Sequence, residues 1–278
     1  MQALVLGTAQ WGNAYGVTNS QGRLSDAAIA EIARIALESG ISQVDTAGDY
    51  GDAEHRLAPW AARFSVTTKV KGSSAASVAD QLGHSLGDLG LERLRCCLVH
   101  DWPSLTDDRA AQVAAELREL QQQGLVQRVG ISAYDEADLR RARLLFDGLG
   151  AVQVPVSILD RRLDDSDVIA ELVDAEVEIQ ARSVLLQGLL VGSTSSALGA
   201  HPDVLRFRSH CSDIGVEPRA LALGFIRTLG WVSQVVLGVT SAEELSQITA
   251  TWAESPEIDH EGFRGSSDLA LIDPRLWA

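Results

Sequence analysis

The stretch ISQVDTAGDYGDAEH, residues 41–55, begins as a short apolar run and continues into a polar segment rich in turn residues. This order is typical of a β-strand that ends at Asp45 and runs into a loop. In α/β proteins the loops that follow the carboxyl ends of the strands commonly hold the functional residues. The stretch therefore predicts a strand of an α/β fold, followed by a loop that carries functional side chains.

The same alternation of β-rich and helical runs continues along the whole chain. Each β-rich run is nearly uniformly apolar, as expected for parallel strands covered on both faces. Many helical runs begin at a polar capping residue, as Ser25 does before a run that ends at Gly40. The expected strands are 3–8, 41–46, 64–70, 94–100, 126–132, 151–157, 177–183 and 233–239. The expected helices are 26–40, 74–89, 107–124, 135–146, 166–175, 218–230 and 241–254.

Eight strand–helix units in 278 residues match a closed (β/α)8 TIM barrel, formed as a single domain over residues 1–278. A doubly wound open sheet is the alternative. It is disfavoured because GTAQWG (7–12) follows the first strand, where dinucleotide-binding sheets carry G-x-G-x-x-G. The segment 187–214 is Ser/Gly-rich and longer than usual connections, so we expect a long functional loop there.

Composition limits the classes of function. The formal net charge of -15 disfavours nucleic acid or an anionic membrane as a partner. No apolar run approaches the roughly 20 residues of a membrane helix, and the N-terminus lacks the basic region of a signal peptide, so a soluble cytoplasmic protein is expected. The adjacent Cys96 and Cys97 should point to opposite faces of a strand and act as packing residues, and no metal site is expected.

Four titratable residues gather at the ends of three consecutive expected strands. Asp45 ends the second strand, with Tyr50 in its loop, Lys69 lies near the end of the third and His100 ends the fourth. Each alone has an ordinary structural explanation, but together they form a proton donor. The Lys69 ammonium would lower the pKa of Tyr50, Asp45 would hold Lys69 charged, and a neutral His100 would orient a substrate carbonyl.

Three segments carry a family resemblance. DTAGDYGDAEH (45–55), TTKV (67–70) and LVHDW (98–102) resemble the motif regions of the aldo-keto reductase superfamily, and the likeness covers nearly the whole chain. It implies a (β/α)8 barrel that reduces a small-molecule carbonyl with NADPH or NADH. Tyr50 would be the general acid/base, and the other three residues of the cluster would support it.

The resemblance also implies a cofactor site. LGTAQWG (6–12), VGIS (129–132), VQVP (152–155), QARSVLLQGLL (180–190) and LGVTSAEEL (237–245) are similar to segments that run along the dinucleotide. GTAQ, RSVLLQGLL and DPRLW (273–277) resemble a bacterial group associated with sugar biosynthesis, so a keto-sugar is among the substrates considered. The implied cofactor-binding residues are Gly7, Thr8, Ser132, Gln153, Arg182, Ser183, Leu185, Gln187, Gly188, Gly238, Thr240, Ser241 and Glu244.

Two positions near the nicotinamide depart from the family pattern. Ala133 stands where an asparagine is frequent, and Arg182 stands where a tyrosine stacks on nicotinamide. Two interpretations of Arg182 stay open. It lies flat against the nicotinamide, where its charge would favour an anionic substrate, or it points away and pairs with Asp160 or Glu178.

The adenosine segment departs as well. After Gly238, the residues Thr240, Glu244 and Ile248 replace a frequent arginine, glutamine and asparagine. No clamp for a 2′-phosphate is therefore evident, and weak discrimination between NADPH and NADH is predicted.

Trp11 and Trp102 are expected as apolar walls of the substrate pocket, with simple packing on the barrel as the alternative. Two other functions remain open on the same site. One is an acid–base lyase, dehydratase or epimerase that uses Tyr50 and Lys69, and the other is a non-catalytic nucleotide-binding barrel. The sequence indicates neither the oligomeric state nor the physiological substrate.

Overall fold

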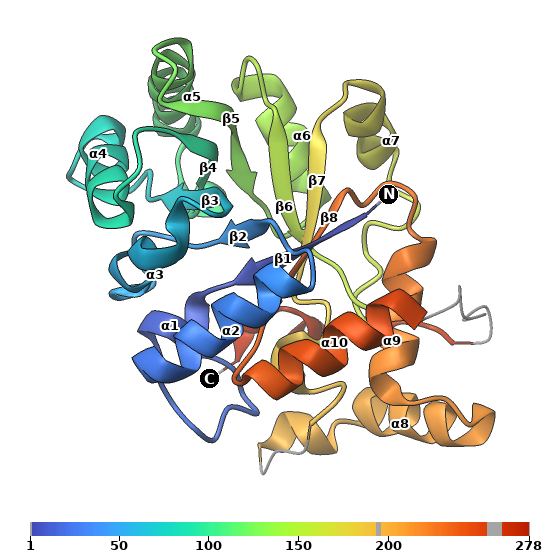
Figure 1. Cartoon of the computed structure of the whole chain (residues 1–278). Helices are drawn as coiled ribbons and strands as arrows, with labels where there is room; N and C mark the ends of the chain where they lie inside the picture. Colours follow the sequence, from blue (N-terminus) through green and yellow to red (C-terminus); the bar gives the residue numbers. More distant parts are fainter. Residues whose placement is uncertain (1, 193–195, 255–262, 278) are drawn as a thin grey trace.

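The computed structural model describes residues 2–192, 196–254 and 263–277. Its eight strands run parallel and close into a barrel, in which each strand pairs with its neighbours in sequence and the last pairs with the first (Figure 1). The expected (β/α)8 TIM barrel is confirmed. The strands are β1 (Ala3–Gly7), β2 (Gln43–Asp45), β3 (Ser65–Val70), β4 (Leu94–Val99), β5 (Val126–Ser132), β6 (Ala151–Pro155), β7 (Glu178–Arg182) and β8 (Gln234–Gly238).

Helices follow the strands and surround the barrel (Figure 1). The longer ones are α2 (Asp26–Glu38), α3 (Ala53–Ala61), α4 (Val78–Leu89), α5 (Asp107–Gln122), α6 (Glu136–Leu145), α7 (Asp167–Asp174), α8 (Pro202–Ile214), α9 (Pro218–Thr228) and α10 (Ala242–Glu254). The short ones are α1 (Ala9–Gly12), α11 (Leu269–Ile272), η1 (Trp102–Ser104), η2 (Leu186–Gly188), η3 (Ala197–Ala200) and η4 (Pro274–Leu276).

Helix α2 illustrates why the elements form where they do. The Ser25 side chain accepts a hydrogen bond from the backbone N–H of Ala28 at 3.2 Å and caps the first turn. Ile29, Ile32 and Ala36 recur on one face of the helix and are buried in the core. This apolar stripe fixes which side of the helix faces the barrel.

Two of the longer helices lie where none was expected from the sequence. Helix α3 follows the Tyr50 loop and contains Pro59, a residue that argues against a helix when only the pattern is considered. Helix α8 occupies much of the segment 187–214, which was expected to be a long loop. The sequence does contain a pattern that indicates this helix: Pro202 stands at its first position, and the apolar Val204 and Phe207, both buried, are spaced about one turn apart.

Successive side chains of β4 point to opposite faces of the sheet, as the sequence predicts for Cys96 and Cys97. Cys96 clusters with Leu98 and Ala151 in a small buried group, whereas Cys97 belongs to the large core that includes the helices. Both thiols are buried and free. The expected packing role of these adjacent cysteines, on opposite faces of β4, is therefore confirmed.

Two further properties bear on the possible functions. Within the described ranges, no helix combines the length and the apolarity that crossing a membrane requires. In the same part of the chain, no three histidine, cysteine or acidic side chains come together in a group that could hold a metal ion.

Strands β5 and β6 approach closely at Gly130, where a Cβ atom would lie 1.7 Å from the carbonyl oxygen of Ala151. We expect Gly130→Ala to lower the free energy of unfolding by about 3 kcal/mol, because a backbone carbonyl in a barrel cannot move aside as a flexible side chain can. Gly83→Ala in α4 is the matched control, since nothing lies within 4 Å of its added Cβ.

The two variants should therefore move in opposite directions. Gly83→Ala should raise the free energy of unfolding by roughly 0.5–1 kcal/mol, because alanine has the higher helix propensity. Urea unfolding of both variants beside the parent protein measures the effect. Equal midpoints for the two variants would show that the close approach of β5 and β6 is not a constraint.

Candidate active site

The carboxyl ends of β2 and β3 bring three of the expected residues together. The Lys69 Nζ donates hydrogen bonds to Asp45 Oδ1 at 2.6 Å and to the carbonyl oxygen of Thr46 at 2.9 Å. It lies 3.3 Å from the hydroxyl of Tyr50. Lys69 and Asp45 are 2% and 3% exposed, so the ion pair is buried at the floor of the open face. Tyr50 is half-buried above it.

The charges around Tyr50 act in opposite directions. Burial raises the pKa of the Tyr50 hydroxyl, and the nearby Lys69 ammonium lowers it, with a net pKa above the ordinary value. For Lys69, burial lowers the pKa, but Asp45 and Tyr50 outweigh this and hold it above its usual range. The lysine is therefore charged and the tyrosine carries its proton at neutral pH. The sequence predicted that Lys69 lowers the pKa of Tyr50, but it did not predict the larger, opposite effect of burial on that pKa.

His100 lies at the rim of the site, with its ring edge-on to the ring of Tyr50 and 5.8 Å between the centroids. Its Nδ1 lies 3.0 Å from Asp49 Oδ1, and the other Asp49 oxygen lies 2.8 Å from the Nζ of Lys71. Burial raises the pKa of Asp49, but the hydrogen bonds from His100 and Lys71 bring it well below its usual range. Asp49 is therefore a carboxylate, and sequence reasoning had missed it.

The Asp49 contact constrains the histidine. A carboxylate only accepts hydrogen bonds, so the proton must lie on Nδ1 of His100. A neutral ring with its proton on Nδ1 has an acceptor at Nε2, and donation to a carbonyl oxygen then requires a ring protonated on both nitrogens. This changes the expected role of His100 as a neutral donor.

A cavity with a volume of about 880 Å³, including its open mouth, lies beside Tyr50. Of the expected cofactor residues, all but Ser132 and Ser241 line it. Ser132 is instead buried in β5, and Ser241 does not line this cavity. The lining residues that the sequence did not single out are Ala9, Gln10, Tyr15, Gly16, Thr18, Asn19, Val184, Val236 and Leu237.

The loop after β7 has an unusual backbone where it lines the cavity. Ser183, Leu186, Gln187 and Gly188 all have positive φ angles, of 60°, 46°, 52° and 91°. Three of them are not glycine, and such strained conformations cluster at functional sites. The Thr18 hydroxyl donates to the carbonyl oxygen of Gln187 at 3.2 Å, so the loop packs against the segment that follows α1.

Gln153 connects the ion pair to the far side of the barrel. Its Nε2 donates to Asp45 Oδ2 at 2.8 Å and to Gln180 Oε1 at 3.0 Å. Both amide hydrogens are therefore engaged, which leaves the Gln153 carbonyl oxygen as the group available to a ligand.

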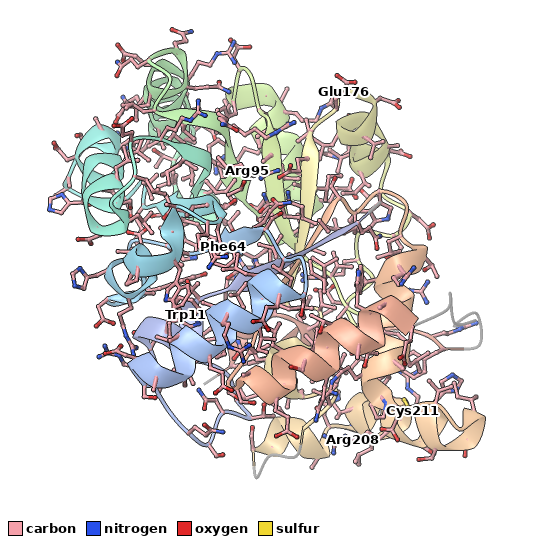
Figure 2. The ribbon with its side chains drawn as sticks, in the orientation of Figure 1. Trp11, Phe64, Arg95, Glu176, Arg208 and Cys211 are labelled. Carbon is pink, nitrogen blue, oxygen red and sulfur yellow. The ribbon has the colours of Figure 1, made fainter. Side chains whose placement is uncertain are left out.

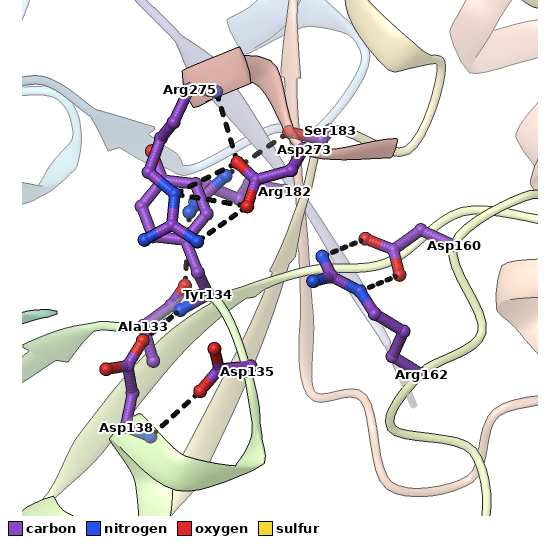
Figure 3. Close-up of polar contacts among 10 residues, drawn as sticks. All are labelled: Ala133, Tyr134, Asp135, Asp138, Asp160, Arg162, Arg182, Ser183, Asp273 and Arg275. Carbon is purple, nitrogen blue, oxygen red and sulfur yellow. Dashed lines mark hydrogen bonds and ion pairs between the residues drawn. The ribbon is translucent and has the colours of Figure 1, made fainter. Parts of the chain in front are cut away.

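Arg182 pairs with neither of the two acids considered from the sequence. Asp160 binds Arg162 at 2.7 Å, and Glu178 binds Arg95 at 3.0 Å. The Arg182 guanidinium lies over the ring of Tyr134 at 4.3 Å and donates to the carbonyl oxygen of Ala133 at 3.1 Å (Figure 3). It has no carboxylate partner among the described residues, and it lines the cavity.

Tyr134 is held from both faces. Arg275, in the C-terminal segment, lies over the other face of its ring at 3.8 Å and is fixed by Asp273 at 2.9 Å (Figure 3). Tyr134, Arg275 and His100 line a second, shallower cavity next to the first. Tyr50 and Arg182 line the first cavity, called the deep cavity below, and their ring contacts His100 and Tyr134 line the second, called the open cavity.

The two tryptophans lie elsewhere than expected. Trp11 and Trp102 are both 0% exposed, and neither lines either of these two cavities (Figure 2 labels Trp11). Trp102 packs against Phe146, with 6.1 Å between the ring centroids. The short helices α1 and η1 turn these side chains inward, so packing explains them and the predicted wall role is not supported.

Comparison with known proteins identifies the relatives of this barrel. A family model described as the aldo/keto reductase family matches residues 3–264. A Pseudomonas aeruginosa protein assigned as an aldo-keto reductase superposes with a TM-score of 0.68 at 22% identity, covering 91% of this chain and 90% of its own. A thermostable aldo-keto reductase crystallised with the inhibitor epalrestat superposes with a TM-score of 0.71 at 19% identity, covering 95% and 93%. A search of curated protein sequences found no match.

The contact between Lys69 and Tyr50 generates a prediction on ionisation. Lys69→Met should move the onset of Tyr50 ionisation to higher pH, because it removes the positive charge that favours the phenolate. The absorbance of tyrosinate during alkaline titration measures this, with the Tyr50→Phe background subtracted. Lys71→Met is the control, since Lys71 pairs with Asp49 and not with Tyr50. A Tyr50 titration that both variants leave unchanged would contradict the contact.

Proposed function

This chain belongs to the aldo/keto reductase family, whose members use NAD(P)H in general, and on that premise we propose that it reduces an aldehyde or ketone with a reduced nicotinamide dinucleotide. The observation that supports the proposal most is the contact of Lys69 with both Asp45 and Tyr50 beside a cavity that Tyr50 and most of the expected cofactor-binding residues line. Family membership supports an oxidoreductase that acts on carbonyl compounds. The roles of individual residues are our proposal.

The cavity suits a dinucleotide in its shape and its polar groups. Gly7, Gly16, Gly188 and Gly238 line it, so backbone forms part of the wall, and a flat ring or a pyrophosphate can approach closely there. The Oε1 of Gln10 is buried at this wall without a hydrogen-bond partner in the described residues. An orphaned acceptor of this kind is satisfied when a ligand donates to it.

The proposed mechanism assigns a task to each residue of the cluster. The bound dinucleotide supplies the hydride. Tyr50 donates its proton to the carbonyl oxygen, which gains negative charge as its carbon is reduced. Lys69 then stabilises the phenolate left on Tyr50, and Asp45 holds Lys69 charged and in place. His100 contacts the substrate from the open cavity, held by Asp49.

Arg182 supports a substrate class within this proposal. It lines the cavity beside Tyr50 and has no carboxylate partner in the described part of the chain. The protein as a whole is strongly acidic, with a formal charge of -15, so an unpaired guanidinium here is a local reversal of charge. We therefore favour a carbonyl compound that also carries a carboxylate or phosphate, such as an acidic keto-sugar.

Tyr50→Phe should lower kcat by about two orders of magnitude or more, because general acid catalysis contributes typically 10²–10⁴ in rate. The ring is retained, so cofactor affinity should stay close to that of the parent protein. Steady-state turnover and calorimetric binding of the dinucleotide measure the two quantities separately. Full activity in the variant would remove Tyr50 from the mechanism.

Arg182→Gln should raise KM for a carboxylated carbonyl substrate by about tenfold, because a charge-assisted hydrogen bond is lost. A neutral aldehyde of similar size, tested in the same variant, is the internal control and should show a much smaller change. A KM that rises equally for the two substrates would contradict the anionic substrate class and leave the reductase proposal intact.

A further inference from the structure

The charged side chains that line the deep cavity differ between its two ends. Near Tyr50, Arg182 turns away from β8 toward the end of β5, where it contacts Ala133 and Tyr134. After β8, the wall is formed by Thr240 and Glu244 at the start of α10, which lies beside α2 and α9 (Figure 1). The end at Tyr50 therefore presents Arg182 and Asp45, whose charge is paired with Lys69, and the other end presents the carboxylate of Glu244.

The carboxylate of Glu244 is fixed in position. Its Oε2 accepts hydrogen bonds from the backbone N–H of Thr240 at 2.7 Å and from the Thr240 hydroxyl at 3.0 Å. Its own backbone N–H donates to Ser241 Oγ at 3.1 Å. These Thr240 donors are the groups that an incoming phosphate would use, and Glu244 already occupies them with a negative charge.

No lysine or arginine side chain in the described ranges lines this end of the cavity. Arg182 is the sole lysine or arginine that lines the cavity in the described ranges, and the remaining positions (1, 193–195, 255–262 and 278) contain no lysine or arginine. Arg206 binds Asp203 at 2.7 Å. Arg208, labelled in Figure 2, donates to the carbonyl oxygens of Leu189 and Gly192 at 3.0 and 2.5 Å. Arg206 and Arg208 are therefore engaged with these partners. Arg219 has an Nε that is buried without a hydrogen-bond partner in the described part of the chain, but it does not line the cavity.

The direction of a bound dinucleotide follows from the chemistry proposed above. Its nicotinamide must lie next to Tyr50 for the hydride and the proton to reach the same carbonyl. Its adenosine half must then extend toward the other part of the cavity, where Glu244 lies. NADH and NADPH differ there alone, since NADPH carries a phosphate where NADH carries the 2′-hydroxyl of the adenosine ribose.

We infer that Glu244 determines the cofactor specificity of this protein and selects NADH, by accepting a hydrogen bond from the ribose hydroxyl and repelling a 2′-phosphate. This rests on the proposed function, because it requires the nicotinamide to lie at Tyr50. A carboxylate that binds ribose hydroxyls and an arginine that binds the 2′-phosphate are the two usual solutions to this selection problem, and the cavity contains the first. This inference differs from the weak discrimination predicted from the sequence.

The test is calorimetric titration of the intact protein with NADH and with NADPH, in the absence of any carbonyl substrate. We expect the Kd of NADPH to exceed that of NADH by about tenfold or more, because a like charge meets the phosphate. Glu244→Gln removes the charge and keeps an acceptor for Thr240, so it should reduce the ratio of the two Kd values at least about threefold, mainly by tightening NADPH.

Glu243→Gln is the matched control. It makes the same change of charge on the same turn of α10, but Glu243 contacts Gln247 at 3.4 Å and does not line the cavity. It should leave the ratio unchanged. The inference is overturned if the parent protein binds NADPH as tightly as NADH, or if Glu243→Gln narrows the ratio as much as Glu244→Gln does.

Different results would overturn the role of Glu244 and the proposed reductase function. NADPH binding that is tighter than NADH binding, together with turnover that depends on Tyr50, would overturn the role of Glu244 and retain the reductase. Absence of binding for both dinucleotides would overturn the proposed function, and the role of Glu244 with it.

Discussion

The buried ion pair between Lys69 and Asp45 is the interaction on which the whole site depends. Removing both charges from water is costly, and the cost is offset because each is fully engaged. Lys69 bonds Asp45, the Thr46 carbonyl and the Tyr50 hydroxyl, and the second oxygen of Asp45 accepts from Gln153. Lys69 reaches Asp45 because β2 and β3 pair in parallel with Asp45 opposite Thr67, so the strand register of the barrel positions the ion pair. Breaking it would leave an uncompensated charge beneath Tyr50.

The ion pair and the two cavities lie around Tyr50. Tyr50 keeps its proton because burial raises its pKa, and the Lys69 ammonium stands ready to stabilise the anion that forms when the proton leaves. Tyr50 lines the deep cavity, and His100, which contacts its ring, lines the open one. Arg182 and Glu244 both line the deep cavity, and our proposals on substrate class and cofactor preference rest on these two charges.

The sequence predicts the fold and the core of the cluster, because both follow from local pattern and strand order. Eight apolar runs with intervening helices define the barrel, and residues at consecutive strand ends, such as Asp45 and Lys69, must lie close in it. The direction of a side chain is not local information. Trp11 could not be placed inside or outside from its neighbours, and the stack of Arg275 on Tyr134 joins segments far apart in the chain. The Asp49 contact with His100 likewise depends on how two loops meet.

The most direct test of the central claim follows the hydrogen atom itself. The protein is incubated with a nicotinamide dinucleotide deuterated at the transferable position of its ring, together with a panel of aldehydes and acidic keto-sugars. The account predicts that deuterium appears on the carbon of the new alcohol in one-to-one ratio with the dinucleotide oxidised. An acid–base lyase or epimerase would instead convert its substrate without net oxidation of the dinucleotide. Conversion of a substrate with no deuterium on the product carbon would contradict the account.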